Sequence, residues 1–265
     1  MLVDYHIHSK FSSDCTADLV SIAENAIRNG MDEIAITDHF EINSSWGSEY
    51  NQDEFFEEIE QLRKAYDGRL IVRSGIEIGN VFLWPDKADE VLKYPYDYVL
   101  ASVHDVDDRD LMIIDYANTD LHELITKYLA DIEATIEWGG FDCLAHFDLP
   151  ARYCSMQGVS LDWDEFDAEI ESILKKLLKY DNKGIELNVS AWRMGYEGFY
   201  DSMPSENIMR MWQRLGGEIV TVGTDSHSAE NAGKCAREGQ EFLLKCGFRE
   251  IATFEQRRPK MHKIN

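Results

Sequence analysis

Two histidines separated by one residue stand near the start of the chain, directly after a short apolar run that ends at Tyr5. In an extended strand alternate side chains lie on the same face, so His6 and His8 can contact one metal ion from one side. A surface strand end with two incidental histidines explains the pair equally well. The pair alone therefore does not decide between the two interpretations.

Further side chains of metal-binding type stand at or just after later β-rich runs. They are Asp38, His39, Glu77, His104, His146, Asp225 and His227. In a parallel α/β barrel the carboxyl ends of all strands meet at one face, where active sites lie. Each position alone can be explained without a metal, as a helix cap, a solvated strand end or a hydrogen-bonded core histidine. For the whole set, such separate explanations would all have to be correct at once. We therefore predict a common metal centre.

The ligand types and their number indicate which ions this centre holds. Imidazole and carboxylate groups suit Zn²⁺, Mn²⁺ or Fe²⁺ better than Mg²⁺ or Ca²⁺. One catalytic ion rarely takes more than four protein ligands, so the set predicts two or three divalent ions, with Glu77 as the bridging carboxylate. The other two histidines, His122 and His262, fall in a predicted helix and in the tail, and we expect both to face solvent.

The elements that must position these residues alternate strand and helix. Strands are predicted at residues 2–5, 33–37, 70–78, 98–103, 141–145, 184–189, 218–222 and 251–254. Helices are predicted at 16–29, 53–66, 86–92, 121–138, 163–180, 207–215 and 229–246, the last interrupted near Gly239. Loops are expected near 44–48 and from 146 to 160, and the basic segment 256–260 is expected to be a solvated terminus. Seven strand–helix units predict a single domain with a parallel sheet, closed or doubly wound.

Composition and missing motifs exclude several classes of protein. Fifty acidic and 26 basic residues give a net charge of −24, which opposes binding of long nucleic acids because phosphates require Lys and Arg. Dinucleotide, Walker and nucleophile-elbow motifs are absent. Five cysteines without C-x-x-C spacing indicate free thiols in a reducing compartment, with Cys143 in the core. Without a signal peptide or an apolar run of about 20 residues, we expect a cytoplasmic protein that does not contact membranes.

Taken together, these segments resemble the polymerase and histidinol phosphatase (PHP) family. The matching segments are His6-Ile7-His8, Thr37-Asp38-His39, Glu77, His104, His146 and Gly223-Thr224-Asp225-Ser226-His227. The length and the opening Asp4-Tyr5-His6-Ile7-His8-Ser9 are most similar to the monofunctional histidinol-phosphate phosphatases. The resemblance implies a distorted (β/α)₇ barrel of the TIM type, a trinuclear metal centre and hydrolysis of L-histidinol phosphate.

The resemblance also implies how the ligands divide among three ions. The implied groups are His6, His8, Glu77 and Asp225 for the first ion, Glu77, His104 and His146 for the second, and His39 and His227 for the third. Some relatives add a histidine to the third group, six positions after the second N-terminal histidine. Here that position is Asp14, whose carboxylate can also bind an ion.

A hypothesis for catalysis follows from this centre. A metal-bridging hydroxide would attack phosphorus, and either Asp38 or the His39/His227 pair would protonate the leaving oxygen. We expect Arg193 and Arg152, which follow the sixth and fifth strands, to bind the phosphate because a planar guanidinium pairs with two phosphate oxygens. Acidic side chains at 105–108 or Glu41 are candidates for recognising the amine of histidinol.

Three alternatives remain open at the level of sequence. The same cluster in this family can cleave a nucleotide or a short oligonucleotide. A metal-dependent amidohydrolase also begins with His-x-His and ends with an aspartate, although such centres often use a carbamylated lysine where Glu77 stands here. A non-catalytic, metal-binding barrel is the third alternative. The sequence does not indicate an oligomeric state.

Overall fold

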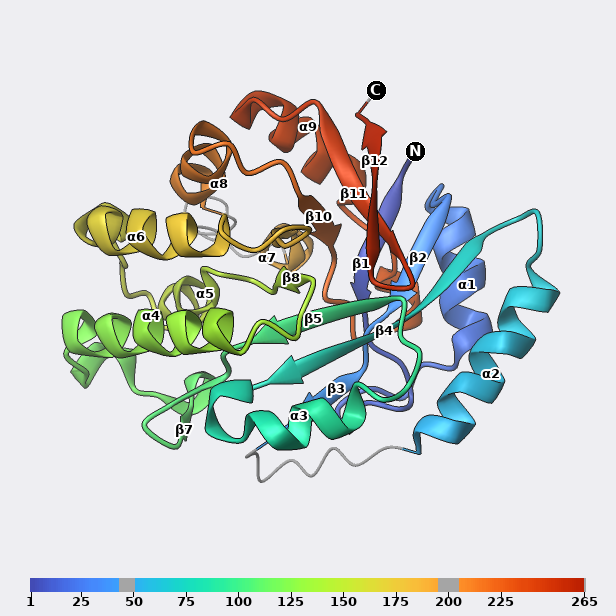
Figure 1. Cartoon of the computed structure of the whole chain (residues 1–265), viewed down its shortest axis with the longest axis horizontal. Helices are drawn as coiled ribbons and strands as arrows, with labels where there is room; N and C mark the ends of the chain where they lie inside the picture. The colour runs from blue at the N-terminus through green and yellow to red at the C-terminus, as the bar shows by residue number, and fades with distance from the viewer. Residues whose placement is uncertain (43–50, 195–204, 265) are drawn as a thin grey trace.

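A parallel sheet that curves into a nearly closed barrel forms the centre of the molecule (Figure 1). The computed structural model describes residues 1–42, 51–194 and 205–264, so the polar loop predicted at 44–48 lies outside the described residues. The barrel strands, in spatial order, are β1 (Val3–Ile7), β2 (Glu33–Ile36), β4 (Ile71–Gly79), β5 (Tyr98–Ser102), β8 (Cys143–Leu144), β9 (Gly184–Asn188) and β10 (Val220–Gly223). The short strand β3 (His39–Glu41) pairs with the carboxyl end of β4. The predicted seven-stranded α/β barrel is confirmed.

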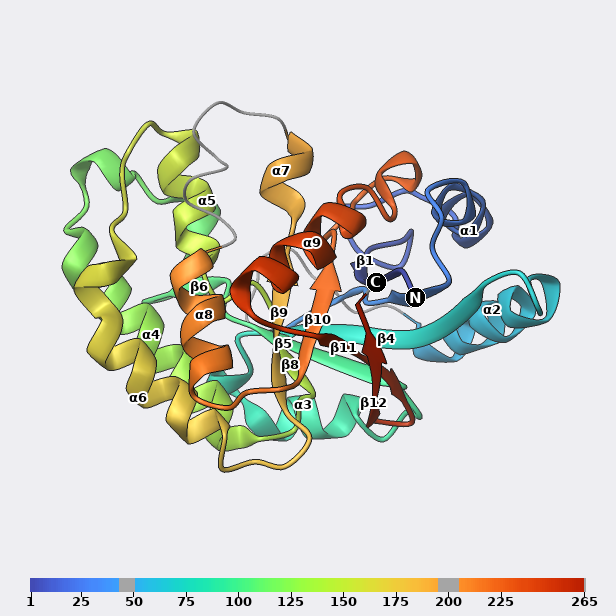
Figure 2. The same cartoon turned by 90° about the horizontal axis from the view of Figure 1, so that it is seen from above.

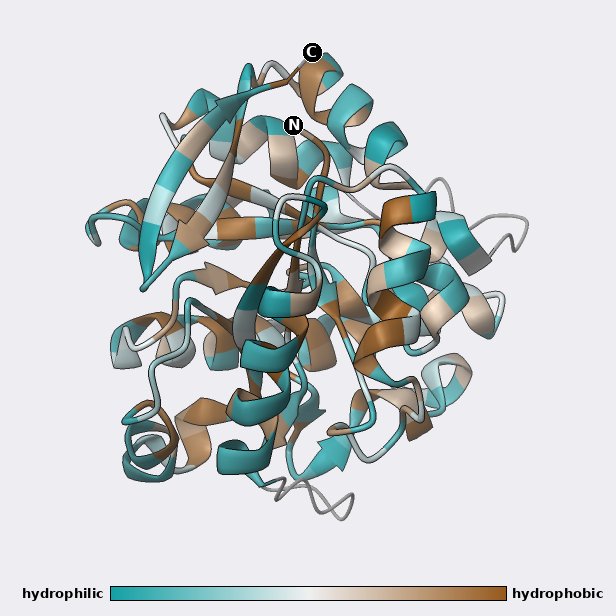
Figure 3. Cartoon of the chain, turned by 90° about the vertical axis from the view of Figure 1, so that its right-hand side faces the viewer, coloured by the Kyte–Doolittle hydropathy of each residue, from teal (hydrophilic) through white to brown (hydrophobic). Residues whose placement is uncertain are grey.

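Helices surround this barrel and connect its strands. They are α1 (Leu19–Arg28), α2 (Gln52–Ala65), α3 (Pro85–Val91), α4 (Leu121–Trp138), α5 (Leu149–Met156), α6 (Asp167–Leu177), α7 (Ser190–Met194), α8 (Glu206–Arg214) and α9 (Ala236–Cys246). Short 3₁₀ turns are η1 (Val81–Leu83), η2 (Leu111–Ile113), η3 (Tyr116–Asn118), η4 (Trp163–Phe166) and η6 (Ala229–Asn231). Figure 3 shows apolar residues along the central strands and hydrophilic ones on the helix α2 that faces the viewer. This distribution is expected when each helix buries one apolar face against the sheet.

The seam between the first and last barrel strands lies next to the predicted ligands. The Asp225 amide donates to the His6 carbonyl at 2.8 Å, and the His8 amide donates to the Ser226 carbonyl at 3.0 Å. Below them, both carboxylate oxygens of Asp4 accept hydrogen bonds from Thr224. The barrel is thus closed by few backbone bonds, all close to the metal-ligand candidates.

The end of the described chain corrects one prediction. The segment 256–260 is not a free terminus, because residues 256–257 form the turn between β11 (Glu250–Glu255) and β12 (Arg258–Lys263) and residues 258–260 begin β12, in an antiparallel hairpin against the sheet (Figure 2). The Phe254 amide donates to the Tyr5 hydroxyl, and Arg257 forms an ion pair with Asp142. These contacts are nonlocal, so a local charge pattern could not predict them. The hairpin packs beside the amino ends of the barrel strands.

Other differences from the predicted elements are local. The predicted loop 146–160 contains α5, and the acidic loop contains a small hairpin of β6 (Asp105–Val106) and β7 (Arg109–Asp110). The interruption expected near Gly239 falls earlier, where Cys235 adopts a positive φ of 66° before α9. No helix in the described ranges is long and apolar enough to cross a membrane.

Candidate metal centre

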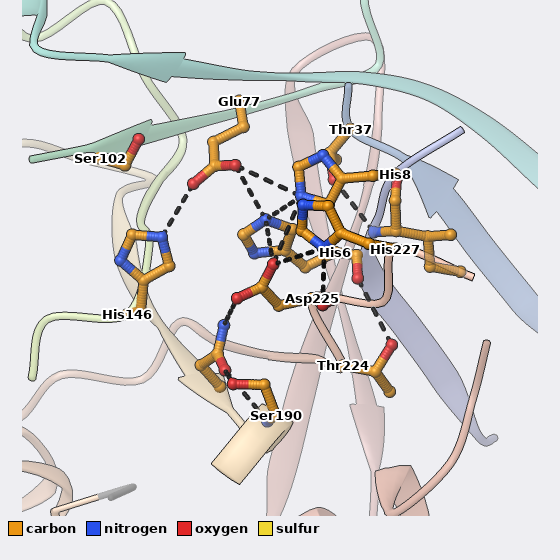
Figure 4. Close-up of polar contacts among 12 residues, drawn as sticks. His6, His8, Thr37, Glu77, Ser102, His146, Ser190, Thr224, Asp225 and His227 are labelled. Carbon is orange, nitrogen blue, oxygen red and sulfur yellow. Dashed lines mark hydrogen bonds and ion pairs between the residues drawn. The ribbon is translucent and has the colours of Figure 1, made fainter. Parts of the chain in front are cut away.

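The predicted ligands converge at the carboxyl end of the barrel. His6 lies in β1, Glu77 lies in β4, and Asp225 follows β10. Figure 4 shows the side chains of His6, His8 and His227 side by side next to Glu77 and Asp225, with His146 on the opposite, left-hand side of Glu77. Strands far apart in sequence thereby place their polar ends in one buried region, as expected for a parallel barrel.

A first group of donor atoms surrounds the Nε2 atom of His6. This atom lies 3.0 Å from His8 Nε2 and 3.1 Å from Glu77 Oε2. Asp225 Oδ1 lies 3.4 Å from His8 Nε2 and 3.8 Å from His6 Nε2. All four side chains are buried, so four donors with little access to water surround one point.

A second group lies on the other side of the Glu77 carboxylate. Glu77 Oε1 is 2.9 Å from His146 Nε2 and 3.3 Å from His104 Nε2. The two imidazole nitrogens are 3.4 Å apart. Because Oε2 faces the first group and Oε1 the second, Glu77 has the orientation of a bridging carboxylate.

A third group lies at the entrance of the site and includes Asp14. His227 Nε2 is 3.4 Å from His39 Nε2 and 3.1 Å from Asp14 Oδ2, and the His39–Asp14 separation is 3.6 Å. Burial alone would raise the pKa of Asp14, but hydrogen bonds to His227 and His39 hold this pKa well below its usual range. The carboxylate at position 14 thus points to the place where a histidine is expected in some relatives.

Four of the six converging histidines have a hydrogen-bond partner at Nδ1, on the side of the ring away from the other imidazoles. A neutral imidazole that donates through Nδ1 presents a lone pair at Nε2. The Nδ1 contacts are His6 to Glu186 at 2.7 Å, His8 to Ser12 at 3.0 Å, His104 to Glu41 at 2.7 Å and His227 to the Asp225 carbonyl at 3.2 Å. With the proton held on Nδ1, the Nε2 lone pairs of His6 and His8 would face one another at 3.0 Å, and a cation bound by both nitrogens would stabilise that arrangement.

The donor set fits divalent ions on three physical grounds. Ligands about 2.0–2.1 Å from a tetrahedral zinc are about 3.3 Å apart, which matches the separations within each group. Burial and the neighbouring His227 and His39 hold the pKa of His8 well below its usual value, so His8 is a neutral ligand. Burial opposes ionisation of Glu77, yet His6, His39 and His104 keep its pKa well below the usual range, so the centre contains a buried carboxylate charge.

The two predicted arginines both line the cavity above the centre. Arg152 Nη2 donates to Asp225 Oδ2 at 2.7 Å and to Ser190 Oγ at 2.6 Å. Arg193 Nη2 donates to the Thr224 and Asp225 carbonyls at 3.3 and 3.0 Å. These bonds fix one side of each guanidinium and leave other N–H groups for an anion.

The predicted catalytic carboxylate Asp38 lies behind the histidines rather than in the cavity. It is fully buried, accepts hydrogen bonds from Ser9 through both carboxylate oxygens, and accepts a further one from the Ser12 hydroxyl at 2.8 Å. Since Ser12 donates to Asp38, the same hydroxyl accepts from His8 Nδ1. Asp38 therefore orients His8 through Ser12, and this geometry does not favour it as a proton donor to a substrate.

The remaining predictions of side-chain positions have mixed outcomes. His122 is exposed and Cys143 is buried in the core, as predicted. His262 does not simply face solvent, because its Nε2 lies 2.8 Å from the Thr253 hydroxyl within the hairpin. Of the acidic loop, Asp107 and Asp108 are exposed, whereas Asp105 faces the cavity.

A cavity of about 500 Å³ opens over the three groups. Its lining includes the two arginines and the apolar or aromatic side chains Met112, Leu149, Tyr153 and Met156. The Asp105 carboxylate has no hydrogen-bond or ion-pair partner among the described residues. Burial and the nearby Glu41 raise its pKa to about 6. This combination suits a small molecule with an anionic, a cationic and a flat apolar part.

Comparison with known proteins agrees with this geometry. The model of the PHP domain matches residues 4–190. The chain belongs to the PHP domain family. Among curated PHP relatives, the probable histidinol-phosphatase of Thermotoga maritima is 30% identical over 95% of both chains, and the histidinol-phosphatase of Lactococcus lactis is 27% identical over 95% of this chain and 94% of its own. A crystal structure of the Lactococcus lactis histidinol phosphate phosphatase, complexed with zinc, L-histidinol and phosphate, superposes with a TM-score of 0.85 at 26% identity and covers 98% of both chains.

Two residues beside the candidate centre were missed by the sequence analysis. Glu186 was not singled out, and Glu41 was considered only for the amine of histidinol, although each contacts a candidate ligand histidine at Nδ1. A charged residue inside the apolar run Gly184–Asn188 was the available signal for Glu186. Glu41 had no such signal, because its contact with His104 depends on the pairing of β3 with β4.

Proposed function

We propose that this protein is a divalent-metal-dependent phosphomonoesterase that hydrolyses L-histidinol phosphate to L-histidinol and inorganic phosphate. The observation that carries the proposal is the position of two arginines and three groups of potential metal-ligand atoms around one cavity. Relatives named histidinol-phosphatase that align over most of the chain support the choice of substrate.

Each donor group would hold one ion, and zinc, manganese or iron suits its ligands. The proposed sets are His6, His8, Glu77 and Asp225; Glu77, His104 and His146; and His39, His227 and Asp14. Bound divalent ions lower the pKa of water and neutralise phosphate charge, which this slow reaction requires. The residues around them exclude bulk water and hold the ligand atoms in place.

The phosphate group would lie between the ions and the two arginines. Arg152 and Arg193 are anchored through Asp225 and the adjacent backbone, so their remaining N–H groups are oriented before substrate binds. Such preorganised guanidinium groups bind phosphate oxygens strongly and with defined geometry. Arg152 would therefore have two roles, because it orients Asp225 and also contacts phosphate.

The histidinol part would lie across the cavity from the ions. The Asp105 carboxylate is placed to bind the ammonium group, and Met112, Tyr153 and Met156 offer an apolar wall to the imidazole. Glu41 is committed to His104, so it is a weaker candidate for the ammonium than the sequence indicated.

The proton for the leaving oxygen would come from the cavity side. His39 and His227 line the cavity, whereas Asp38 is enclosed behind them. If the enzyme works with two ions, the His39/His227 pair is available to donate this proton. If it works with three, the pair holds the third ion instead.

Turnover of L-histidinol phosphate by the zinc- or manganese-loaded protein tests the proposal. We expect kcat/KM at least a hundredfold above that for an aryl phosphate or a short oligonucleotide. Arg193→Ala should lower kcat/KM for all phosphate esters, whereas Asp105→Asn should raise KM about ten- to hundredfold for histidinol phosphate alone because a charge-assisted contact is lost. Arg258→Ala, at an exposed position, is the control. Equal rates on all three substrates would contradict the assignment to histidinol phosphate.

A further inference from the structure

Two glutamates that belong to none of the three donor groups contact histidines of the centre. Glu186 Oε1 accepts from His6 Nδ1 at 2.7 Å, and its Oε2 accepts from the His146 amide at 2.8 Å and from Asn188 at 3.3 Å. The Glu186 side chain is buried. One carboxylate thus connects a histidine of the first donor group with the backbone of a histidine of the second.

Glu41 makes the equivalent contact on the other side of the centre. Its Oε1 accepts from His104 Nδ1 at 2.7 Å, and its Oε2 accepts from Asn80 Nδ2 at 3.4 Å. Asn80 cannot exchange its amide atoms freely, because its oxygen already accepts the His104 and Asp105 amides at 2.8 and 2.9 Å. The direction of the Glu41 contact is therefore fixed by the backbone that carries His104.

Both carboxylates occupy space that a glycine leaves open on a neighbouring strand. A Cβ atom at Gly79 would come 2.1 Å from Glu41 Oε2, and one at Gly223 would come 2.0 Å from Glu186 Oε1. At Gly79 the three nearest atoms all belong to the Glu41 carboxylate, so a methyl group there would first meet that carboxylate. The same local arrangement, a glutamate over a glycine and against a ligand histidine, occurs on two sides of the barrel.

We infer that Glu41 and Glu186 are positioning residues that set the divalent-metal affinity of the centre by fixing the orientation and tautomer of His104 and His6. A carboxylate on Nδ1 keeps the proton on that nitrogen and makes Nε2 a more basic ligand. Loss of such a contact typically weakens metal binding by about 10- to 100-fold. The inference rests on the metal centre of the proposed function and not on its substrate.

Glu186→Gln is an informative substitution because both carboxylate oxygens of Glu186 accept a hydrogen bond. In Glu186→Gln the single carbonyl can accept from either His6 or His146, and the amide group then faces the other donor. In Glu41→Gln the new amide faces either His104 Nδ1 or Asn80 Nδ2. Gly79→Ala tests the same contact without removing a carboxylate, since the added methyl displaces Glu41.

Zinc affinity, measured by competition with a chromophoric chelator on folded protein, tests the inference without substrate. We expect the Kd of the weakened ion to rise about 10- to 100-fold in Glu186→Gln, Glu41→Gln and Gly79→Ala. Glu33→Gln is the matched control, because Glu33 is also a buried strand glutamate but contacts Tyr5 and Arg73 away from the centre. Its zinc affinity should equal that of the parent protein.

Four results would overturn the inference wholly or in part. Wild-type zinc affinity in both Glu186→Gln and Glu41→Gln would contradict the positioning role. Wild-type zinc affinity in Gly79→Ala would contradict it for Glu41. Equal weakening in Glu33→Gln would show a general loss of stability. If Glu186→Gln does not fold, Glu186→Asp keeps the charge but shortens the reach, and normal zinc affinity in that variant would reject the role of Glu186. A failure of histidinol phosphate turnover alone would leave this inference intact.

Discussion

At the scale of single residues, we propose that Asp14 decides whether the centre can hold a third ion. Its carboxylate completes a group with His227 at 3.1 Å and His39 at 3.6 Å. Without it, two imidazoles alone would have to hold an ion close to solvent. The third site thus depends on one side chain near the entrance, whereas the other two share the buried Glu77.

Replacing Asp14 should therefore remove one ion. We expect Asp14→Ala to lower the metal content of protein equilibrated with zinc by about one ion per chain, and Asp14→His to restore it. Metal analysis after gel filtration gives the count. Asp18→Ala removes an exposed helix cap four residues away and should keep the full content. A complete set of ions in Asp14→Ala would assign no ion to this group.

The ligand histidines could be predicted from sequence because each lies where a strand ends, and strand ends are visible as apolar runs. The side chains that hydrogen-bond to these histidines could not be predicted in this way. The role of Asp38 depends on Ser12, and that of Glu41 depends on strand pairing, neither of which leaves a local pattern. Glu186 was visible only as one charge in an apolar strand, a pattern that Glu33 shares without contacting the centre.

At the scale of elements, the hairpin β11–β12 supports β1 from the side opposite the cavity. Phe254 is fully buried and packs against Tyr5 and Tyr98, with ring centroids 6.5 and 4.9 Å apart. Tyr5 immediately precedes His6, so the hairpin fixes the strand from which the first ligands project. The hydrogen bond from the Phe254 amide to the Tyr5 hydroxyl adds a polar contact to this packing.

The hairpin should accordingly contribute to the stability of the whole barrel. We expect Phe254→Ala to lower the free energy of unfolding of the metal-free protein by about 3–5 kcal/mol, as for other buried phenylalanines. Urea denaturation measures the change. The exposed neighbour Arg258→Ala should stay within about 0.5 kcal/mol of the parent. A loss below about 1 kcal/mol for Phe254→Ala would show that the hairpin is only loosely attached.

At the scale of the whole molecule, the excess of acidic groups extends into the interior at the metal centre. The chain carries a net charge of −24, and Glu77 and Asp225 are buried within it. Bound cations offset that buried charge. A ligand that binds only the native state adds about 2.7 kcal/mol to its stability at one hundred times its Kd.

Chelation should therefore lower the melting temperature, and added zinc should restore it. Thermal unfolding followed by circular dichroism, with and without a chelator, measures the shift. The His6→Ala/His8→Ala double variant lacks two ligands of the first group, so its melting temperature should respond much less to the chelator. An equal response in parent and double variant would place the stabilising ions elsewhere.

The seam between β1 and β10 has a consequence for how the chain folds. Its strands are about 220 residues apart in sequence, as the Asp4–Thr224 contact shows, so the ring closes only after a very long loop is ordered. Long-range closure of this kind slows folding and leaves strand edges open in the meantime. His6 and His8 stand on one side of the seam and Asp225 on the other, so an ion shared by them would join the two strands whose pairing closes the barrel.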